Sequence, residues 1–414
     1  MNTNARFIVV SLSAIYFTAP AYSQSTVTLY GLVDAGLNYL SNAQTARLSS
    51  GPAGKSQISL QEGSVGGQNG SRWGLLGSED LGGGTSATFR LESGFAINNG
   101  TLGQGGAEFG RQAFVGLKAQ YGTITLGRQY DSVASYVGPF AASTQWGGYI
   151  SGHTGDVDNY LNTRRINNSI KYASPVYRGF TFGGLYSFGG VAGSVGSKQL
   201  WSIGAGYSAG PVALAAAYLN ARNPNLSFYG TNPSALTTAA GNNIGSAGSP
   251  SSPETNPVIA GYASANTIQI AAIGAAYQFG SATLGLTYSN VQFRNLGDTA
   301  SSGPNSLGYH GAAKFNTTEA NAKYQLTPSL LAGVAYNYTH NSGADGSGSA
   351  TYHQASIGTD YFLSKRTDIY GIMVYQHASG TDSLGQPAVA YITGQTASAS
   401  NHQIALRLGL RHRF

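Results

Sequence analysis

Charged side chains recur on one face of short segments that alternate between apolar and polar residues. In the segment that begins at Ser71, Trp73 and Leu75 share the apolar face, which places Arg72 on the other face. The same reasoning places six charged residues on the polar faces of neighbouring segments: Arg72, Arg90, Glu92, Arg111, Arg165 and Lys171. This mostly basic set predicts that the polar faces act on solutes through fixed charge.

Two of these placements depend on which neighbouring residues belong to the apolar face. Phe114 and Gly116 are assigned to it, so Arg111 is expected on the polar face. Ile166 is assigned to it as well, which directs Arg165 to the polar face. A ladder of cations along neighbouring segments follows from these assignments.

The stretch from Ser132 to Thr163 carries the opposite charge. Its only charged residues before Thr163 are Asp156 and Asp158, and Asp131 lies at its root. Glycines and one proline inside the stretch supply turns. We therefore expect an acidic loop in this position.

The histidines offer no catalytic or metal-binding pattern. They are scattered along the chain without a motif beside them: His153, His310, His340, His353, His377, His402 and His412. Phosphate-loop, dinucleotide and zinc signatures are missing, and so is cysteine, so we expect no cofactor and no metal site. A hydrolase that pairs serine or aspartate with a histidine is the enzymatic alternative, but we predict that the chain is not an enzyme.

The composition indicates a surface that tolerates uncharged side chains. Charged residues make up only 9% of the chain, against about 25% in a typical soluble domain. A lipid-facing barrel has such a surface, because its outside meets hydrocarbon and its inside meets water. The formal net charge of +6 includes no basic run of the kind that binds nucleic acid. As a bulk charge it predicts a weak preference for anions, which loop carboxylates can override locally.

The first residues predict export. Phe7–Ala19 is an apolar run that is too short to span a bilayer, which needs about 20 residues. Ala21-Tyr22-Ser23 then offers small residues to a signal peptidase. We expect residues 1–23 to be a signal peptide, cleaved between Ser23 and Gln24, and residues 24–414 to form one exported domain.

The rest of the chain predicts an all-β fold. Short connections such as Ala209–Pro211 and Thr327–Pro328 alternate with long ones. The long connections are Ser41–Gly70, Ser132–Thr163, Asn223–Tyr262, Arg294–Ala313 and Gly380–Ser400. This pattern is typical of a transmembrane antiparallel β-barrel, and we count about 16 strands. The alternation loses phase near Ala271-Ala272, which we interpret as a β-bulge.

Stretches along the whole exported chain carry a family resemblance. They are VTLYGLVD (27–34), SRWGLLGSEDLGGG (71–84), LESGF (91–95), RQAFVGL (111–117), YGTITLGRQYD (121–131), RINNSIKY (165–172) and GLRHRF (409–414). Together they resemble the general porins of Gram-negative bacteria, particularly the β-proteobacterial type. The terminal strand, which ends on Phe414, resembles the signal read by the outer-membrane assembly machinery.

The resemblance implies a 16-stranded barrel in the cell outer membrane, assembled as a homotrimer among outer-membrane lipids. It also implies a water-filled channel for passive diffusion of small hydrophilic solutes and inorganic ions. The third extracellular loop, here 132–163, would fold inward and narrow the pore. The basic wall would then consist of Arg72, Arg90, Arg111, Arg165 and Lys171. The acidic side would consist of Glu92, Asp131, Asp156 and Asp158.

Arg128 departs from this arrangement. Ile124 and Leu126 assign it to the apolar face, where a cation in mid-bilayer costs about 2–4 kcal/mol. A subunit contact would remove that cost, so we predict that Arg128 lies at the trimer contact, facing a neighbour's loop 98–108. Arg164 has the same parity. The alternative for both is a strand-end position that reaches the lipid headgroups.

Two channel-related alternatives stay open. A substrate-specific outer-membrane channel for a sugar or an organic acid has the same strand pattern, with a tighter eyelet and often a track of aromatic residues. No clear aromatic ladder follows the polar faces. A purely structural barrel or adhesin needs fewer strands than this chain supplies.

Overall fold

Alternation of apolar and polar residues produces strands with two different faces. The computed structural model describes residues 25–346 and 348–414, and the predicted signal peptide of residues 1–23 lies outside them. In the strand Leu330–Asn341, Val334 and Tyr336 are exposed, whereas Asn337 and Thr339 are buried. The exposed apolar face is the outer surface, and the buried polar face lines the interior.

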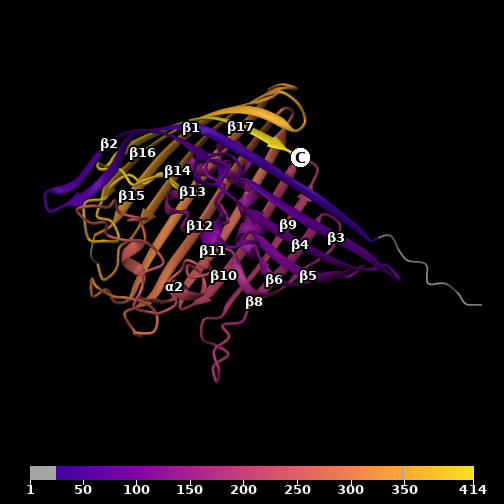
Figure 1. The fold of residues 1–414 in the computed structure, drawn as a ribbon, viewed down its shortest axis with the longest axis horizontal. Helices are drawn as coiled ribbons and strands as arrows, with labels where there is room; N and C mark the ends of the chain where they lie inside the picture. Colours follow the sequence, from indigo (N-terminus) through magenta and orange to yellow (C-terminus); the bar gives the residue numbers. More distant parts are fainter. Residues whose placement is uncertain (1–24, 347) are drawn as a thin grey trace, which may run out of the picture.

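These strands close into a barrel (Figure 1). The last strand, His402–Arg413, pairs antiparallel with the first, Thr26–Leu48. The two strands that follow the first, Gly51–Glu62 and Arg72–Gly82, pair with it along different stretches, so they share one place in the wall. The 17 strands of the described chain therefore fill 16 places, and the predicted 16-stranded antiparallel barrel is confirmed.

The strands differ in length around the barrel. Their bounds are β1 Thr26–Leu48, β2 Gly51–Glu62, β3 Arg72–Gly82, β4 Thr85–Gly94, β5 Gln112–Ala119, β6 Gly122–Gln129, β7 Ile166–Ala173, β8 Phe180–Ser187, β9 Leu200–Ala209, β10 Val212–Arg222, β11 Ala265–Phe279, β12 Ala282–Leu296, β13 Ala312–Thr327, β14 Leu330–Asn341, β15 Ala350–Phe362, β16 Thr367–Gly380 and β17 His402–Arg413. β5 to β8 have 8 residues each, whereas β11 to β16 have 12 to 16. The barrel thus has a short wall and a tall wall.

Helical structure is confined to short turns in the connections. These are α1 Gly63–Gly66, η1 Gln104–Gly106, η2 Val133–Val137, η3 Gly138–Phe140, η4 Ser143–Gly147, η5 Tyr149–Ser151, η6 Thr154–Asp156, α2 Pro224–Ser227 and η7 Ala260–Tyr262. Across residues 25–346 and 348–414, no helix is long and apolar enough to cross a membrane. Most of these turns lie in the connection between β6 and β7.

Two sequence-based expectations about the strands are wrong. The stretch Ser41–Gly70 is not a long loop, because β1 continues to Leu48 and β2 begins at Gly51. β11 has no bulge at Ala271-Ala272, since its register with both neighbours is continuous there. The apparent loss of phase arises because Ile268 and Ile270 face inward, where the connections from the long-loop end pack on them.

Candidate functional site

The connection between β6 and β7 packs on the buried face of the tall wall. Glu319 of β13 accepts a hydrogen bond from the Ala142 amide at 2.7 Å. The side chains of Asn337 and Gln354 donate to the carbonyls of Ser151 (3.3 Å) and Gly152 (3.0 Å). Neutral amides and one carboxylate on β13 to β15 thus hold the connection by its main chain.

Small residues in the wall make room for the connection. The indole of Trp146 lies against Gly333 of β14 and Gly358 of β15, where a Cβ atom would come within 2.3 and 2.9 Å of the ring. Phe140 lies against Gly274 of β11 in the same way, at 3.0 Å. Side chains at these three positions would push the connection away from the wall.

A fully buried histidine forms a clamp between the connection and β13. His153 Nδ1 lies 2.6 Å from Asp158 Oδ2, and its Nε2 lies 3.3 Å from Glu319 Oε2. Burial alone lowers the pKa of His153, but the two carboxylates outweigh it and raise the pKa to about 10. The clamp is therefore a cation between two anions at neutral pH. Ser289 of β12 donates a further hydrogen bond to Asp158.

A second inward segment lies between β2 and β3. Residues 63–71 leave the wall at α1, and the Tyr149 amide of the first connection donates to the Gly67 carbonyl at 2.8 Å. A Cβ at Gly148 would come within 2.4 Å of the same carbonyl, and this residue also has a positive φ of 61°. The two inward segments therefore touch each other, at a position that requires glycine.

Basic side chains gather on the wall beside these segments. Arg111 donates from Nε to Glu92 at 2.7 Å, and its Nη2 donates to the Tyr130 hydroxyl at 3.3 Å. Arg72 lies 3.8 Å from the other oxygen of Glu92. Arg165 is buried near them and has no ion pair with a carboxylate among the described residues. Burial, and then the charge of Arg111, lower its pKa.

Two further cations that were predicted for the basic wall lie on the same inner face. The guanidinium of Arg90 lies 5.7 Å from the centre of the Tyr30 ring, whose hydroxyl donates to Glu92. Lys171 donates to the Tyr130 carbonyl at 2.7 Å and to Ser135 at 3.0 Å. The structure therefore brings together Arg72, Arg111 and Arg165, with Arg90 and Lys171 beside them.

A cavity of about 340 Å³ separates this cluster from the inward connection. Arg72, Arg111 and Tyr130 line one side, and Pro139, Ser143, Thr144 and Tyr149 line the other. Arg111 Nη1 and Arg165 Nε are buried donors without a hydrogen-bond partner in the described part of the chain. The cavity lining thus includes the cations Arg72 and Arg111 and no carboxylate, an arrangement suited to anions and water.

The predicted acidic residues do not face this cavity. Asp131 caps the start of η2, where its Oδ1 accepts from the amides of Val133 (2.7 Å) and Ala134 (3.0 Å). Asp156 accepts from Leu161 and Thr163 within the connection, and burial raises its pKa to about 6.

Asp158 belongs to the histidine clamp. Glu92 lies among the arginines of the basic wall, not across from them. These four carboxylates therefore do not form the expected acidic surface opposite the basic wall.

Arg111 and Arg165 reach the interior for a different reason from the one that the alternation gave. Val115 and Leu117 are the exposed apolar residues of β5, so Phe114 points inward and the assigned parity is wrong. Arg111 lies before the strand begins and turns inward there.

In β7 the register shifts between Ser169 and Ile166, beside Asn168, which has a φ of 51°. Ile166 therefore faces inward and is fully buried. Its assignment to the outer face is wrong, whereas Ile170 does lie on the exposed face as expected. Arg165, like Arg111, lies just outside its strand.

Arg128 has partners within its own chain. Its guanidinium donates to the carbonyls of Gly110 (2.8 Å) and Thr231 (2.9 Å), to Asn232 (2.9 Å), and also to Asn167. Arg164 stacks on Tyr229 at 5.0 Å from the ring centre. Both arginines therefore contact the connection between β10 and β11.

The chain end joins the first strand. Phe414 and Gly31 exchange backbone hydrogen bonds of 3.0 and 3.1 Å, and the phenyl ring covers the glycine. The predicted role of Phe414 as an assembly signal stays a prediction.

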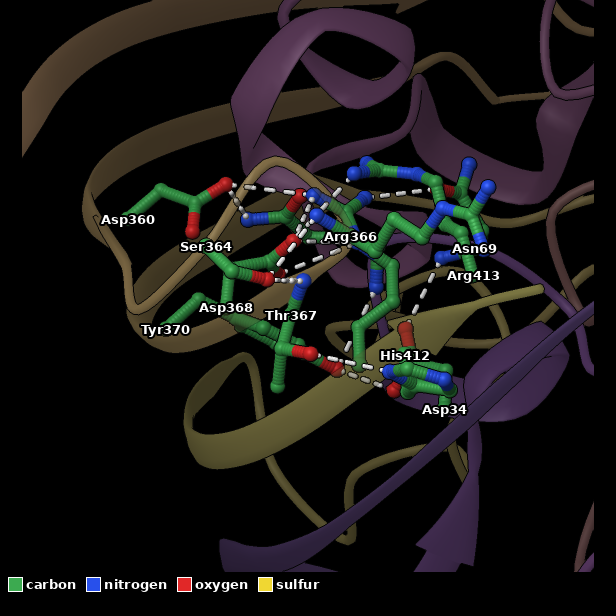
Figure 2. A network of polar contacts seen from close by, with 12 residues as sticks. Asp34, Asn69, Asp360, Ser364, Arg366, Thr367, Asp368, Tyr370, His412 and Arg413 are labelled. Carbon is green, nitrogen blue, oxygen red and sulfur yellow. Dashed lines mark hydrogen bonds and ion pairs between the residues drawn. The ribbon is translucent and has the colours of Figure 1, made fainter. Parts of the chain in front are cut away.

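A second charged network was missed by the sequence reasoning (Figure 2). Arg407 pairs with Asp34 at 2.9 Å, and the Tyr370 hydroxyl donates to the same carboxylate. Arg411 pairs with Asp368 at 3.0 Å and with Asp360 at 3.2 Å. The polar parity of these strands was the available signal, but parity does not show which strands meet when the barrel closes.

The fully buried His153 is paired with an aspartate, as the enzymatic alternative requires, but not with a serine. Both nitrogens of the buried His153 face carboxylates, and Ser289 bonds to Asp158, not to the imidazole. Within residues 25–346 and 348–414, no group of three or more histidines and carboxylates could hold a metal ion.

Comparisons with known proteins agree with this architecture. The chain matches the family described as Gram-negative porin over residues 10–381. It is 27% identical to outer membrane porin protein 32 of Delftia acidovorans, over 98% of this chain and 99% of that protein. It is 40% identical to an outer membrane porin protein of Bordetella pertussis, but that match covers 42% of this chain and only 45% of the relative.

Solved structures show the same fold. An anion-selective porin from Comamonas acidovorans has a TM-score of 0.65 at 20% identity, covering 94% of this chain and all of that one (100%). In-vitro folded OmpT of Vibrio cholerae has a TM-score of 0.61 at 14% identity, covering 94% and 98%. With the family match along most of its length, the chain belongs to the Gram-negative porins and is a barrel protein of the outer membrane.

Proposed function

We propose that this porin is a passive channel for small hydrophilic solutes, with a preference for anions set at the cavity beside Arg72, Arg111 and Arg165. The observation that carries the proposal is the imbalance of charge there. Glu92 is the single carboxylate that contacts the cluster among the described residues. Fixed cations beside a narrow cavity raise the local concentration of anions.

The inward connection supports an anion preference, because it turns no carboxylate to the cavity. Its carboxylates Asp131, Asp156 and Asp158 are buried and hydrogen-bonded within the connection or to the wall. The side it turns to the cavity is neutral, with Pro139, Ser143 and Thr144. We propose that it acts as the pore constriction and leaves the basic wall unopposed. The name of the Comamonas porin describes the same selectivity.

The short wall supports a homotrimer. A transmembrane strand needs about 9–11 residues, and β5 to β8 have only 8. We propose that this wall faces neighbouring subunits, with Arg128 of β6 near the contact. One of the Vibrio OmpT structures is described as a trimer form. We also propose that the chain has no enzymatic activity and that Phe414 is read during assembly.

Reversal potentials across planar bilayers test the proposal. Purified protein is inserted and a tenfold gradient of potassium chloride is applied. The expected potential has the sign of a chloride-preferring pore, and current rises linearly with salt. A potential of the opposite sign would overturn the anion preference. Current that saturates at millimolar concentrations of an organic anion would instead favour a substrate-specific channel.

A further inference from the structure

Three of the seven histidines, which are far apart in the sequence, lie side by side in the sheet. His353 of β15 is paired in register with His377 of β16, and His377 is paired in turn with His402 of β17. The three strands are neighbours in the barrel wall (Figure 1). These three residues, which we call the histidine row, therefore lie at one level of the wall, although no sequence motif marks them.

The histidine row faces outward at the rim of the barrel. On each strand an exposed apolar residue lies two or four positions from the histidine, and is thus on the same face: Ile357 on β15, Tyr375 on β16 and Leu406 on β17. On the other side of the row, at the long-loop end, all three strands stop within three residues. His353 and His377 are partly exposed, and His402 is exposed. The row is therefore at the edge of the apolar wall, where water and dissolved ions reach it.

Neutral groups hold each ring through one nitrogen. His353 Nδ1 lies 2.6 Å from the Tyr336 hydroxyl. The Asn401 side chain contacts the other two rings, with its Nδ2 at 3.2 Å from His377 Nε2 and its Oδ1 at 3.2 Å from His402 Nδ1. The second nitrogen of each ring has no hydrogen-bond partner in residues 25–346 and 348–414. A hydrogen bond that orients one imidazole nitrogen and leaves the other free is how proteins hold metal-binding histidines.

The spacing of the row suits an ion shared by two rings. Directly opposite residues of antiparallel strands have Cβ atoms about 4.5–5.5 Å apart. A zinc–imidazole bond is about 2.0–2.1 Å long, so two neighbouring rings can reach one ion between them. No group of three histidines and carboxylates in the described chain could hold an ion, so we assign two rings to the ion and water to its remaining positions.

The absence of carboxylates around the row selects the kind of ion. None lies within ion-pair distance of these three histidines in the part of the chain that the structure describes, where His153 is the histidine with such partners. Calcium and magnesium prefer oxygen ligands, whereas zinc, copper and nickel bind imidazole well.

From these observations we infer that the histidine row is a binding site for a divalent transition-metal ion at the outer rim of the barrel. His377 belongs to the site in either arrangement, because it stands between the other two, and His353 or His402 supplies the second ligand. The ion joins β16 to a neighbouring strand, so it should stabilise the folded barrel. The inference depends neither on the proposed anion preference nor on the proposed trimer contact.

Titration of the purified protein in detergent with Zn²⁺ and with Cu²⁺ tests the inference. The protein carries no histidine tag, and isothermal titration calorimetry measures affinity and stoichiometry. We expect one ion per chain, and electron paramagnetic resonance of the Cu²⁺ form should show coupling to imidazole nitrogen. A wild-type protein that binds neither ion would overturn the inference.

Variants locate the ion. His377→Gln removes the ring that both arrangements share and should abolish binding, and His353→Gln/His402→Gln, which leaves His377 alone, should do the same. The matched control is His310→Gln/His412→Gln, which removes two exposed histidines, one in the loop before β13 and one at the opposite end of β17, and should bind as the wild type does. Circular dichroism checks that each variant folds.

Three outcomes would contradict the assignment. The first is wild-type affinity in either variant of the row, and the second is loss of binding in the control. The third is displacement of Zn²⁺ by an equal concentration of Ca²⁺, because an ion that exchanges in this way is held by carboxylates elsewhere.

Discussion

Two groups of buried arginines line the interior of this barrel, and they differ in charge balance. The first group belongs to the network around the aspartates that are labelled in Figure 2. In it, Arg407 and Arg411 each pair with at least one aspartate on a neighbouring strand. In the cluster beside the cavity, Arg72 and Arg111 share Glu92, and Arg165 has no carboxylate partner in the described chain. Arginine therefore forms balanced ion pairs in one place and leaves a net positive charge in the other.

The difference follows from where each group lies. The balanced network joins β15, β16 and β17 to Asp34 of β1, which is where the two ends of the chain close the barrel. Charges buried there must be compensated, since an unpaired one is expensive. The cluster borders a cavity, where water or a solute can compensate the charge.

The largest expected effect tests the balanced network. Arg407→Ala leaves Asp34 buried without its cation, and should lower the free energy of unfolding by about 3–5 kcal/mol. Urea unfolding of the protein folded into lipid vesicles measures this change, with the exposed Arg366→Ala as the control. A loss no larger than that of the control would show that the network contributes nothing to closure.

The next effect tests the unbalanced cluster. Arg165→Gln removes a cation that has cations as neighbours, so the unfolding free energy should hold or rise. The ratio of anion to cation permeability should fall about fivefold, as expected for a change of roughly 1 kcal/mol from one charge a few ångströms away. Reversal potentials measure the ratio. Arg165→Lys, which keeps the charge, should behave as the wild type does.

The sequence predicted strands well where one face meets lipid and the other meets water. β14 and β17 are of this kind, since their exposed residues alternate with buried polar ones as expected. The alternation failed where the interior is packed with protein. Ile268 and Ile270 of β11 are apolar and face inward, because connections cover them. Apolar residues on the inner face disturb the alternation, and this disturbance was interpreted as a bulge.

The prediction for the beginning of the chain was wrong for a different reason. Residues 41–62 carry few apolar side chains, and yet they form the hairpin of β1 and β2. This hairpin contacts other connections at the long-loop end, as in the pair of Arg47 with Glu254 at 3.4 Å. Beyond the hydrocarbon, neither face of a strand needs to be apolar, so the period of two disappears.

The candidate site was predictable as a set of charges but not as a geometry. Parity predicted that the cations lie on the inner face. Arg111 and Arg165 do so, but they lie just before their strands begin, where parity does not apply. Whether a loop carboxylate faces solvent or caps its own loop depends on backbone contacts. Asp131 and Asp156 therefore could not be assigned from sequence.

A third group of charges sharpens the comparison, because it can be switched by pH. The His153 clamp holds one cation between Asp158 and Glu319, and its pKa of about 10 lies above the ordinary value of 6.5. A raised pKa means that its stabilisation is complete below pH 6.5 and is lost as pH rises through 10. The protein should therefore lose about 1–3 kcal/mol of stability between about pH 7 and pH 10.5.

Thermal unfolding in detergent across that pH range measures the effect. His153→Asn should remove most of the pH dependence, because the titrating group is gone. His412→Asn, which changes an exposed histidine bonded to Thr367, is the matched control and should keep it. A wild-type profile that is flat across the whole range would show that the clamp is not ionised as described.

The last expected effect concerns Arg128, whose charge is neither paired with a carboxylate nor directed at the cavity. Its donors are occupied by Gly110, Thr231 and Asn232 of its own chain. If the short wall is also the subunit contact, Arg128→Ala should lower the heat stability of the trimer by about 1–2 kcal/mol, through a loosened β10–β11 connection at that contact. Semi-native electrophoresis over a temperature series measures trimer loss, and limited proteolysis measures the connection. Faster cleavage in residues 223–264 with an unchanged trimer would assign Arg128 to its own chain alone and remove it from the contact.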